Sequence, residues 1–218
     1  MYFNNDQTAQ LNALIEKIEQ RTGIELVAAV VGKCDNYPEI PWKAFALAVA
    51  ISTLAQLVLA IVQPDWTLAW SEQYLLVLIL GISAAFTLLS VYWPAFGRLF
   101  LDSIRADAEI GQYARVFFLE RELFRTRART GILLLISLFE RRVVILPDTG
   151  VAGRLEQKAL RAVIQQMIPH LRRRDHFQAL FRGLSALEAE LLLTGSGPAK
   201  KTDNELKDEL IQQKGVDR

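Results

Sequence analysis

The chain of 218 residues is 51% hydrophobic and 22% charged, and its 25 basic and 24 acidic residues leave a formal net charge of +1. This balance argues against nucleic-acid binding, because nucleic-acid-binding domains usually carry a strongly basic patch or stripe. The single cysteine, Cys34, excludes an internal disulfide and fits a reducing compartment. Residues 1–20 lack the basic start and apolar core of a secretory signal peptide, so we expect this part of the chain to stay in the cytoplasm.

The first residues of the chain predict a helix followed by a buried strand. Asp6 or Thr8 can cap a helix that runs to about Gln20, because each side chain offers an oxygen to the first turn. One face of this helix is apolar and consists of Leu11, Leu14, Ile15 and Ile18. Residues 23–31, GIELVAAVV, are apolar almost throughout, which is typical of a strand buried on both faces.

Two apolar segments in the middle of the chain are each long enough to cross a membrane. A spanning helix needs about 20 apolar residues, and residues 44–62 and 74–93 reach that length without a charged side chain. Tryptophans and tyrosines lie near the segment ends, where aromatic rings favour the lipid headgroups. A hairpin buried in a soluble core is the alternative, but little chain remains to cover two helices that are apolar all round. We therefore expect a transmembrane helical hairpin.

Basic residues predict how this hairpin is oriented. The loop between the two segments, residues 63–73, contains no Lys or Arg. Lys33 and Lys43 precede the first segment, and Arg98 and Arg105 follow the second. Because cytoplasmic flanks of membrane spans are enriched in Lys and Arg, both termini are expected in the cytoplasm. The sequence thus predicts a multi-pass protein of the cytoplasmic membrane.

The chain after the hairpin predicts further helices and strands. A helix is expected over about residues 109–127. Its apolar stripe consists of Tyr113, Val116, Phe117, Leu123 and Phe124. Residues 131–138 and 142–146 are apolar runs typical of strands, and the three-residue link between them requires antiparallel neighbours. Two helices, over about residues 152–172 and 175–193, complete the pattern.

These elements describe one cytoplasmic α/β domain that the hairpin interrupts. Residues 1–40 and 97–194 form the domain, because one strand with one helix cannot bury its apolar faces alone. Residues 41–96 form the hairpin. Residues 195–218 are polar and charged with little to bury, so we expect a flexible tail.

Three segments of the chain resemble the TPM domain family: RTGIELVAAVV, FFLEREL and TRARTGILLLISLFERRVVILPDTGV. The resemblance is greatest to bacterial membrane proteins with a two-helix insertion, and it implies a three-layer α/β/α fold with a small sheet. Family branches include weak acid phosphatases, calcium-binding proteins and accessory membrane proteins. Similar bacterial proteins often occur with LemA-type membrane proteins. One departure is that FNNDQTAQL has no glycine where secreted relatives have an Asp-x-Ala-Gly-like segment.

A candidate site lies at one edge of the predicted sheet. If the first two strands are parallel, Glu25, Arg129, Thr130 and Asp148 gather there. Glu25 and Asp148 are the candidate ligands for Ca²⁺ or Mg²⁺, which prefer oxygen donors, although Ca²⁺ takes six to eight of them. The alternative is a structural ion pair between a strand-end carboxylate and Arg129 or Arg127. The opposite edge, with Cys34, Asp35 and Glu140, is expected to face the bilayer.

The sequence favours a non-enzymatic accessory protein over an enzyme. It contains an anchor and a fold, but no residue cluster with the spacing of a known catalytic centre. It indicates no cofactor apart from the Ca²⁺ or Mg²⁺ of the candidate site. The expected partners are the lipid bilayer and another membrane protein, for which the family resemblance suggests the LemA type. Its expected location is the cytoplasmic (inner) membrane of a bacterium. The alternative, suggested by one family branch, is a divalent-cation-dependent phosphatase-like hydrolase.

Overall fold

The computed structural model describes residues 2–63, 72–193 and 210–215. They fall into two compact units. The sheet unit consists of residues 1–35 and 107–218, and the hairpin unit consists of residues 36–106.

The sheet unit is built on four strands in the order β3-β2-β1-β4. β1 (Leu26–Val31) is parallel to β2 (Ile132–Ser137), and β2 is antiparallel to β3 (Arg142–Pro147). Both relationships confirm the sequence prediction. The fourth strand, β4 (Ile211–Gln213), pairs in parallel with β1 on its other side. All residues of β1 and β2 are buried, as their continuous apolar sequences predict.

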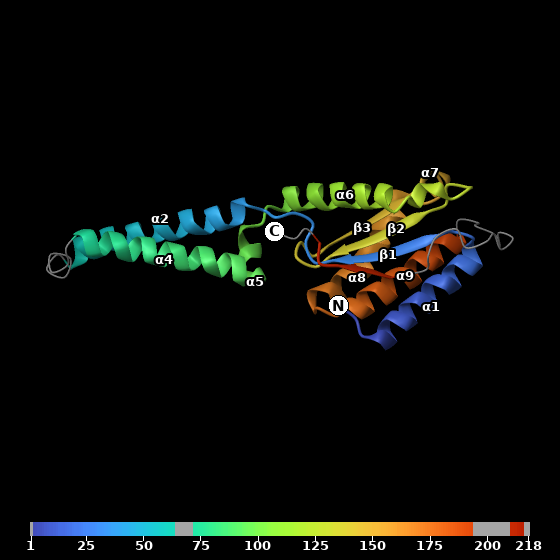
Figure 1. Ribbon diagram of the computed structural model, residues 1–218, viewed down its shortest axis with the longest axis horizontal. Helices are drawn as coiled ribbons and strands as arrows, with labels where there is room; N and C mark the ends of the chain where they lie inside the picture. Colours follow the sequence, from blue (N-terminus) through green and yellow to red (C-terminus); the bar gives the residue numbers. More distant parts are fainter. Residues whose placement is uncertain (1, 64–71, 194–209, 216–218) are drawn as a thin grey trace. The chain divides into compact units, whose positions relative to one another are not determined.

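Helices cover both faces of this sheet (Figure 1). α1 (Asn5–Thr22), α8 (Gln157–Arg172) and α9 (His176–Leu193) pack on one face, and α6 (Ser103–Glu120) lies on the other. Alternate residues of β1 serve the two cores: Ala28 and Val30 join the core under α1, α8 and α9, whereas Val27, Ala29 and Val31 join the core under α6. The predicted three-layer α/β/α fold is therefore confirmed.

The cap of α1 differs from the prediction. Asn4, not Asp6 or Thr8, is the N-cap: its side chain accepts a hydrogen bond from the Gln7 N–H (2.7 Å), and the Gln7 side chain accepts one from the Asn4 N–H. This reciprocal capping box satisfies two donors of the first turn, which a lone Asp6 or Thr8 cap does not.

α6 ends earlier than the sequence pattern predicts. The helix stops at Glu120, not near residue 127, and Glu122 adopts a left-handed conformation (φ 53°) before a short 3-10 turn, η2 (Leu123–Arg125). Leu123 is thereby turned into the core beneath α6, where it is only 2% exposed. Burial of this side chain outweighs the helix propensity of its charged neighbours.

The next helix begins later than predicted. A single turn, α7 (Thr149–Ala152), follows β3, and α8 starts at Gln157, not at residue 152. Between them, Leu155 is buried at 4% exposure in the main core, and Glu156 has an extended backbone. The break in the helix places Leu155 in this core.

The polar segment predicted as a flexible tail contains β4, so that prediction is wrong for residues 210–213. Leu210 is 5% exposed, and its N–H donates to Asn12 Oδ1 at 3.0 Å. The Gly32 N–H donates to the Gln213 carbonyl at 3.0 Å. Backbone pairing with β1 holds this strand, which explains why it needs few apolar side chains. Residues 195–209 and 216–218 lie outside the described residues.

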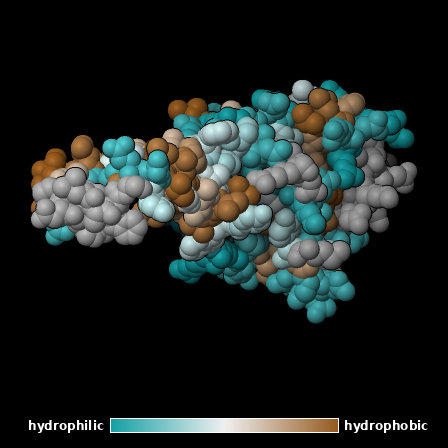
Figure 2. Space-filling view, turned by 60° about the vertical axis from the view of Figure 1, so that its left-hand side comes forward, coloured by the Kyte–Doolittle hydropathy of each residue, from teal (hydrophilic) through white to brown (hydrophobic). Residues whose placement is uncertain are grey.

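The hairpin unit contains two long helices, α2 (Glu39–Val62) and α4 (Glu72–Tyr92), followed by α5 (Pro94–Gly97) and η1 (Arg98–Phe100). Both long helices are long and apolar enough to cross a membrane, which agrees with the predicted spans. Only 6% and 11% of their most apolar windows are buried within the structure. In Figure 2 hydrophobic residues colour much of the hairpin's visible surface, whereas the sheet unit is mainly hydrophilic.

In the hairpin most buried positions are small or polar and many exposed positions are large and apolar, which is the reverse of a water-soluble helix pair. The buried positions of α4 are Ser83 and Ser90, and those of α2 include Ala44 and Ala48. The serine hydroxyls donate to carbonyls of their own helix, Ser83 to Ile79 at 2.8 Å and Ser90 to Thr87 at 2.7 Å. Large apolar residues point outward instead. They include Leu54, Leu57, Ile61, Leu76, Val77 and Leu88, each more than half exposed.

Candidate functional site

The structure brings the predicted edge residues to one end of the sheet. Asp148 follows β3 and donates its N–H to the Gly131 carbonyl (2.8 Å), while Glu25 precedes β1 and its carbonyl accepts the Ile132 N–H (2.8 Å). β2 nevertheless runs between them. Two strand spacings, about 9.6 Å, therefore separate the backbones of Glu25 and Asp148.

Asp148 has two structural contacts. It is 6% exposed, and its Oδ1 accepts the Thr149 N–H at 2.7 Å, which caps α7. Its Oδ2 lies 3.5 Å from the Arg129 Nε. Arg129 is itself fixed, because its Nη1 donates to the Phe124 carbonyl at 2.9 Å. The alternative of a strand-end ion pair is thus present in the structure.

The fit of these residues to a divalent cation is poor. Ca²⁺ takes six to eight oxygen ligands, and no group of three or more His, Cys, Asp or Glu that could hold a metal occurs in the described part of the chain. The guanidinium of Arg129 already supplies the positive charge next to Asp148. Thr130 donates its backbone N–H to Thr126 Oγ1 at 2.9 Å. Cation binding by Glu25 and Asp148 stays a prediction.

The opposite end of the sheet holds a buried polar cluster. Glu140, in the turn between β2 and β3, is 5% exposed and accepts the Cys34 N–H at 2.9 Å. Its other carboxylate oxygen accepts the hydroxyl of Ser137, which is fully buried. Cys34, Ser137 and Glu140 thus join the end of β2 to the segment that leaves β1.

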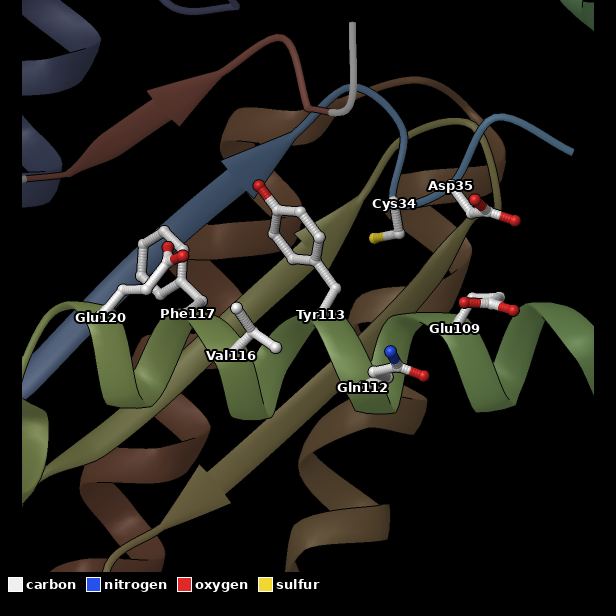
Figure 3. Close-up of a pocket in the computed structure, with 8 residues that line it drawn as sticks. All are labelled: Cys34, Asp35, Glu109, Gln112, Tyr113, Val116, Phe117 and Glu120. Carbon is white, nitrogen blue, oxygen red and sulfur yellow. The ribbon is translucent and has the colours of Figure 1, made fainter.

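A pocket of about 320 Å³ opens beside this cluster, between α6 and the segment after β1 (Figure 3). We call it the α6 pocket. Its lining residues are Cys34, Asp35, Glu109, Gln112, Tyr113, Val116, Phe117 and Glu120. Sequence reasoning assigned Tyr113, Val116 and Phe117 to a core stripe and missed the pocket. The signal that could have revealed it is that Glu109 and Glu120 bracket this apolar stripe.

The α6 pocket has a negative electrostatic environment. Burial, followed by the charge of Glu140, raises the pKa of the Cys34 thiol to about 12, with smaller contributions from Glu109 and Asp35. Burial also raises the pKa of Tyr113, whose hydroxyl donates to Gln213 Oε1 at 3.1 Å. Cys34 is therefore a neutral thiol at physiological pH, which does not suit a nucleophile.

Comparisons with known proteins agree with this architecture. The family model described as the TPM domain matches residues 99–190, which confirms the resemblance seen in the sequence. The NMR structure of the BA42 protein from the psychrophilic bacterium Bizionia argentinensis is similar, with a TM-score of 0.56 and 12% identity. The similarity covers 97% of this chain and 96% of the other, and at this identity it shows the fold alone. No curated protein matches the sequence.

Proposed function

Starting from the TPM domain that this chain contains, we propose a membrane-anchored accessory protein whose sheet unit binds a partner at the cytoplasmic face of a bacterial inner membrane. The observation that carries the proposal is the reversed polarity of the hairpin. Four of the five buried residues of α2 and α4 are alanine or serine, the fifth being Ile40, and leucines, isoleucines and valines face outward. Such a surface is unfavourable in water and favourable in lipid, where apolar side chains contact acyl chains.

The basic residues support an orientation with both termini in the cytoplasm. Lys43 Nζ lies 3.3 Å from the Phe100 carbonyl, and Arg105 pairs with Glu39 at 2.9 Å. These two basic residues lie where the hairpin unit begins and ends, which is the end that the positive-inside rule, based on counts of Lys and Arg, assigns to the cytoplasm.

Contacts of the charged groups in the sheet unit support a binding role. Asp148 caps a helix and pairs with Arg129, and Glu140 holds two neighbouring donors. These carboxylates stabilise the architecture, which suits a rigid platform for another protein. The partner proposed is a second membrane protein, and the LemA type is the first candidate to test.

Labelling from outside the cell tests the topology. In a Cys34→Ser background, a membrane-impermeant maleimide should label Gln63→Cys in intact cells and should label Asp6→Cys only after lysis. The reverse pattern would place the sheet unit outside the cytoplasm. Equal labelling of both positions only after lysis would exclude the transmembrane hairpin.

Crosslinking in native membranes tests the partner. After purification in mild detergent, one membrane protein at constant stoichiometry should be found by mass spectrometry, and it should be absent when the hairpin unit is deleted. The phosphatase-like alternative makes a different prediction. The purified chain alone would then hydrolyse an aryl phosphate with Mg²⁺ or Ca²⁺, and Asp148→Ala would abolish the activity. Calorimetric titration with Ca²⁺ would show heat for the wild type and none for this variant.

A further inference from the structure

The α6 pocket combines carboxylates with aromatic rings. Asp35 and Glu109 lie at one end of it, Glu120 lies at the other, and Tyr113 and Phe117 lie between them (Figure 3). The two rings are nearly stacked, with centroids 6.4 Å apart and an interplanar angle of 26°. The lining set contains three acidic residues and no Lys, Arg or His.

This combination suits a cation at the end of an alkyl chain. Ammonium and guanidinium groups form charge-assisted hydrogen bonds with carboxylates, and they are attracted to aromatic faces. The pocket volume of about 320 Å³ is at the lower end of the range for ligand pockets, which fits one long side chain. A metal ion fits less well, because Glu120 stands at the opposite end from Asp35 and Glu109 (Figure 3), and the described residues contain no group of three or more His, Cys, Asp or Glu that could hold one.

A neighbouring contact already places a guanidinium over one of these rings. The Arg121 guanidinium carbon lies 5.6 Å from the centroid of Phe117. Arg121 lies outside the pocket lining, and its positive charge partly opposes the raised pKa of Tyr113, so the negative charge of the pocket comes from its three lining carboxylates. The raised pKa of Cys34, to which Glu109 and Asp35 contribute, is consistent with negative potential inside it.

We propose that the α6 pocket binds an Arg or Lys side chain from the cytoplasmic juxtamembrane segment of the partner protein. This inference rests on the proposed function. Residues 36–38 alone separate Asp35 from α2, so the pocket is tied closely to the hairpin along the chain. A partner in the same membrane presents Lys and Arg next to its own spans, because cytoplasmic flanks are enriched in them. The charge of that segment complements the three pocket carboxylates.

Binding of a labelled tetra-arginine peptide to the detergent-purified full chain tests the proposal by fluorescence anisotropy. The pocket variant carries Asp35→Asn, Glu109→Gln and Glu120→Gln. Its matched control carries Asp6→Asn, Glu16→Gln and Glu156→Gln, which change the net charge equally at exposed positions outside the pocket. The pocket variant should weaken binding roughly tenfold or more, and the control should change it less than about twofold.

A second pair of variants distinguishes a loss of peptide binding from a loss of folding. Val116 lines the pocket and is 46% exposed, and Leu119 lies on the same helix, outside the lining, and is 61% exposed. Val116→Lys places a competing ammonium in the pocket and should abolish peptide binding, whereas Leu119→Lys should leave it unchanged. Equal affinity of these two variants, or equal loss in both charge-neutralised variants, would overturn the proposal.

The crosslinking experiment separates this inference from the proposed function. If the partner crosslinks equally to the wild type and to the pocket variant, the accessory function stands and the pocket assignment is wrong. If the wild type binds tetra-arginine but has no membrane partner, the pocket chemistry stands and the accessory function is wrong.

Discussion

Glu140 and Cys34 are joined by a 2.9 Å hydrogen bond from the Cys34 backbone N–H to the Glu140 carboxylate. The two residues lie far apart in the sequence, on either side of the hairpin unit. Through this contact the turn after β2 holds the segment that leaves β1, so one buried side chain links the two parts of the sheet unit.

Replacing Glu140 should destabilise the sheet unit. Glu140→Ala leaves the Cys34 N–H and the Ser137 hydroxyl without their acceptor, and we expect a loss of about 2–4 kcal/mol. Glu140→Gln keeps one acceptor oxygen and should cost less. Glu156→Gln, at an exposed position, should stay within about 0.5 kcal/mol of the wild type. Chemical denaturation in detergent measures each value, and equal stabilities of the Glu140→Ala and Glu156→Gln variants would contradict the assigned role.

Cys34 should react very slowly with alkylating reagents in the folded protein. With its pKa raised to about 12, the thiolate fraction at pH 8 is small, so iodoacetamide should modify it at least about a hundredfold more slowly than an exposed cysteine. Asp6→Cys in a Cys34→Ser background supplies the exposed reference. Intact-mass spectrometry follows both reactions, and comparable rates would exclude a buried thiol.

The same shift predicts a loss of stability at alkaline pH. The pKa of Cys34 is higher in the folded chain than its ordinary value of 9.0. Its contribution to stability is therefore complete below about pH 9 and is lost as the pH rises toward 12. Between pH 8 and pH 10 the melting temperature of the wild type should fall more than that of Cys34→Ala, which removes this titration. Parallel curves would contradict the prediction.

Two substitutions in α4 should distinguish the inner from the outer face of the hairpin. Ser83 is fully buried, so Ser83→Leu overpacks the contact with α2 and should cost roughly 1–3 kcal/mol. A side chain at Gly81 meets nothing within 4 Å, so Gly81→Leu should leave the melting temperature of the isolated protein nearly unchanged. If the partner packs against the outer face, Gly81→Leu should weaken its recovery after crosslinking. A lower melting temperature for Gly81→Leu than for Ser83→Leu would contradict this assignment of faces.

Loosening β4 should expose one side of β1. Leu210 is buried beside β4, and Leu210→Ala removes packing that holds this strand, at a cost of at most about 2–5 kcal/mol. Hydrogen exchange followed by mass spectrometry should show faster exchange in residues 29–32, with β3 unchanged. Leu193→Ala is the matched control, because Leu193 is 81% exposed. Unchanged protection of β1 in Leu210→Ala would show that Leu210 does not hold the strand.

The strands and their directions could be predicted because their signals are local. β1 and β2 are continuous apolar runs, and the three-residue link around Glu140 allows only an antiparallel β3. The same reasoning placed Glu25, Arg129 and Asp148 at one edge, since residues that flank neighbouring strands must lie near each other. It also offered an ion pair with Arg129 or Arg127 as the alternative, and the structure selects Arg129 as the partner of Asp148.

The elements that escaped prediction depend on distant contacts. β4 has three residues held by the backbone of β1, so its sequence carries almost no hydrophobic signal. The end of α6 follows from the burial of Leu123, and this burial is favourable only when the core has formed. The α6 pocket needs Asp35 and Glu109 to meet from opposite sides of the hairpin insertion. Side-chain periodicity within one segment reports none of these relationships.

The position of β1 between β2 and β4 also determines the order in which the sheet can form while the chain is synthesised. When the ribosome has made β1, both of its neighbours are still untranslated, because the hairpin unit is made before β2 and β4 comes last. Until its neighbours are made, both edges of β1 are unpaired, and unpaired strand edges favour aggregation or binding by chaperones. Nascent chains arrested before β4 would keep one edge of β1 exposed, where a protease that surveys unfinished proteins could recognise it.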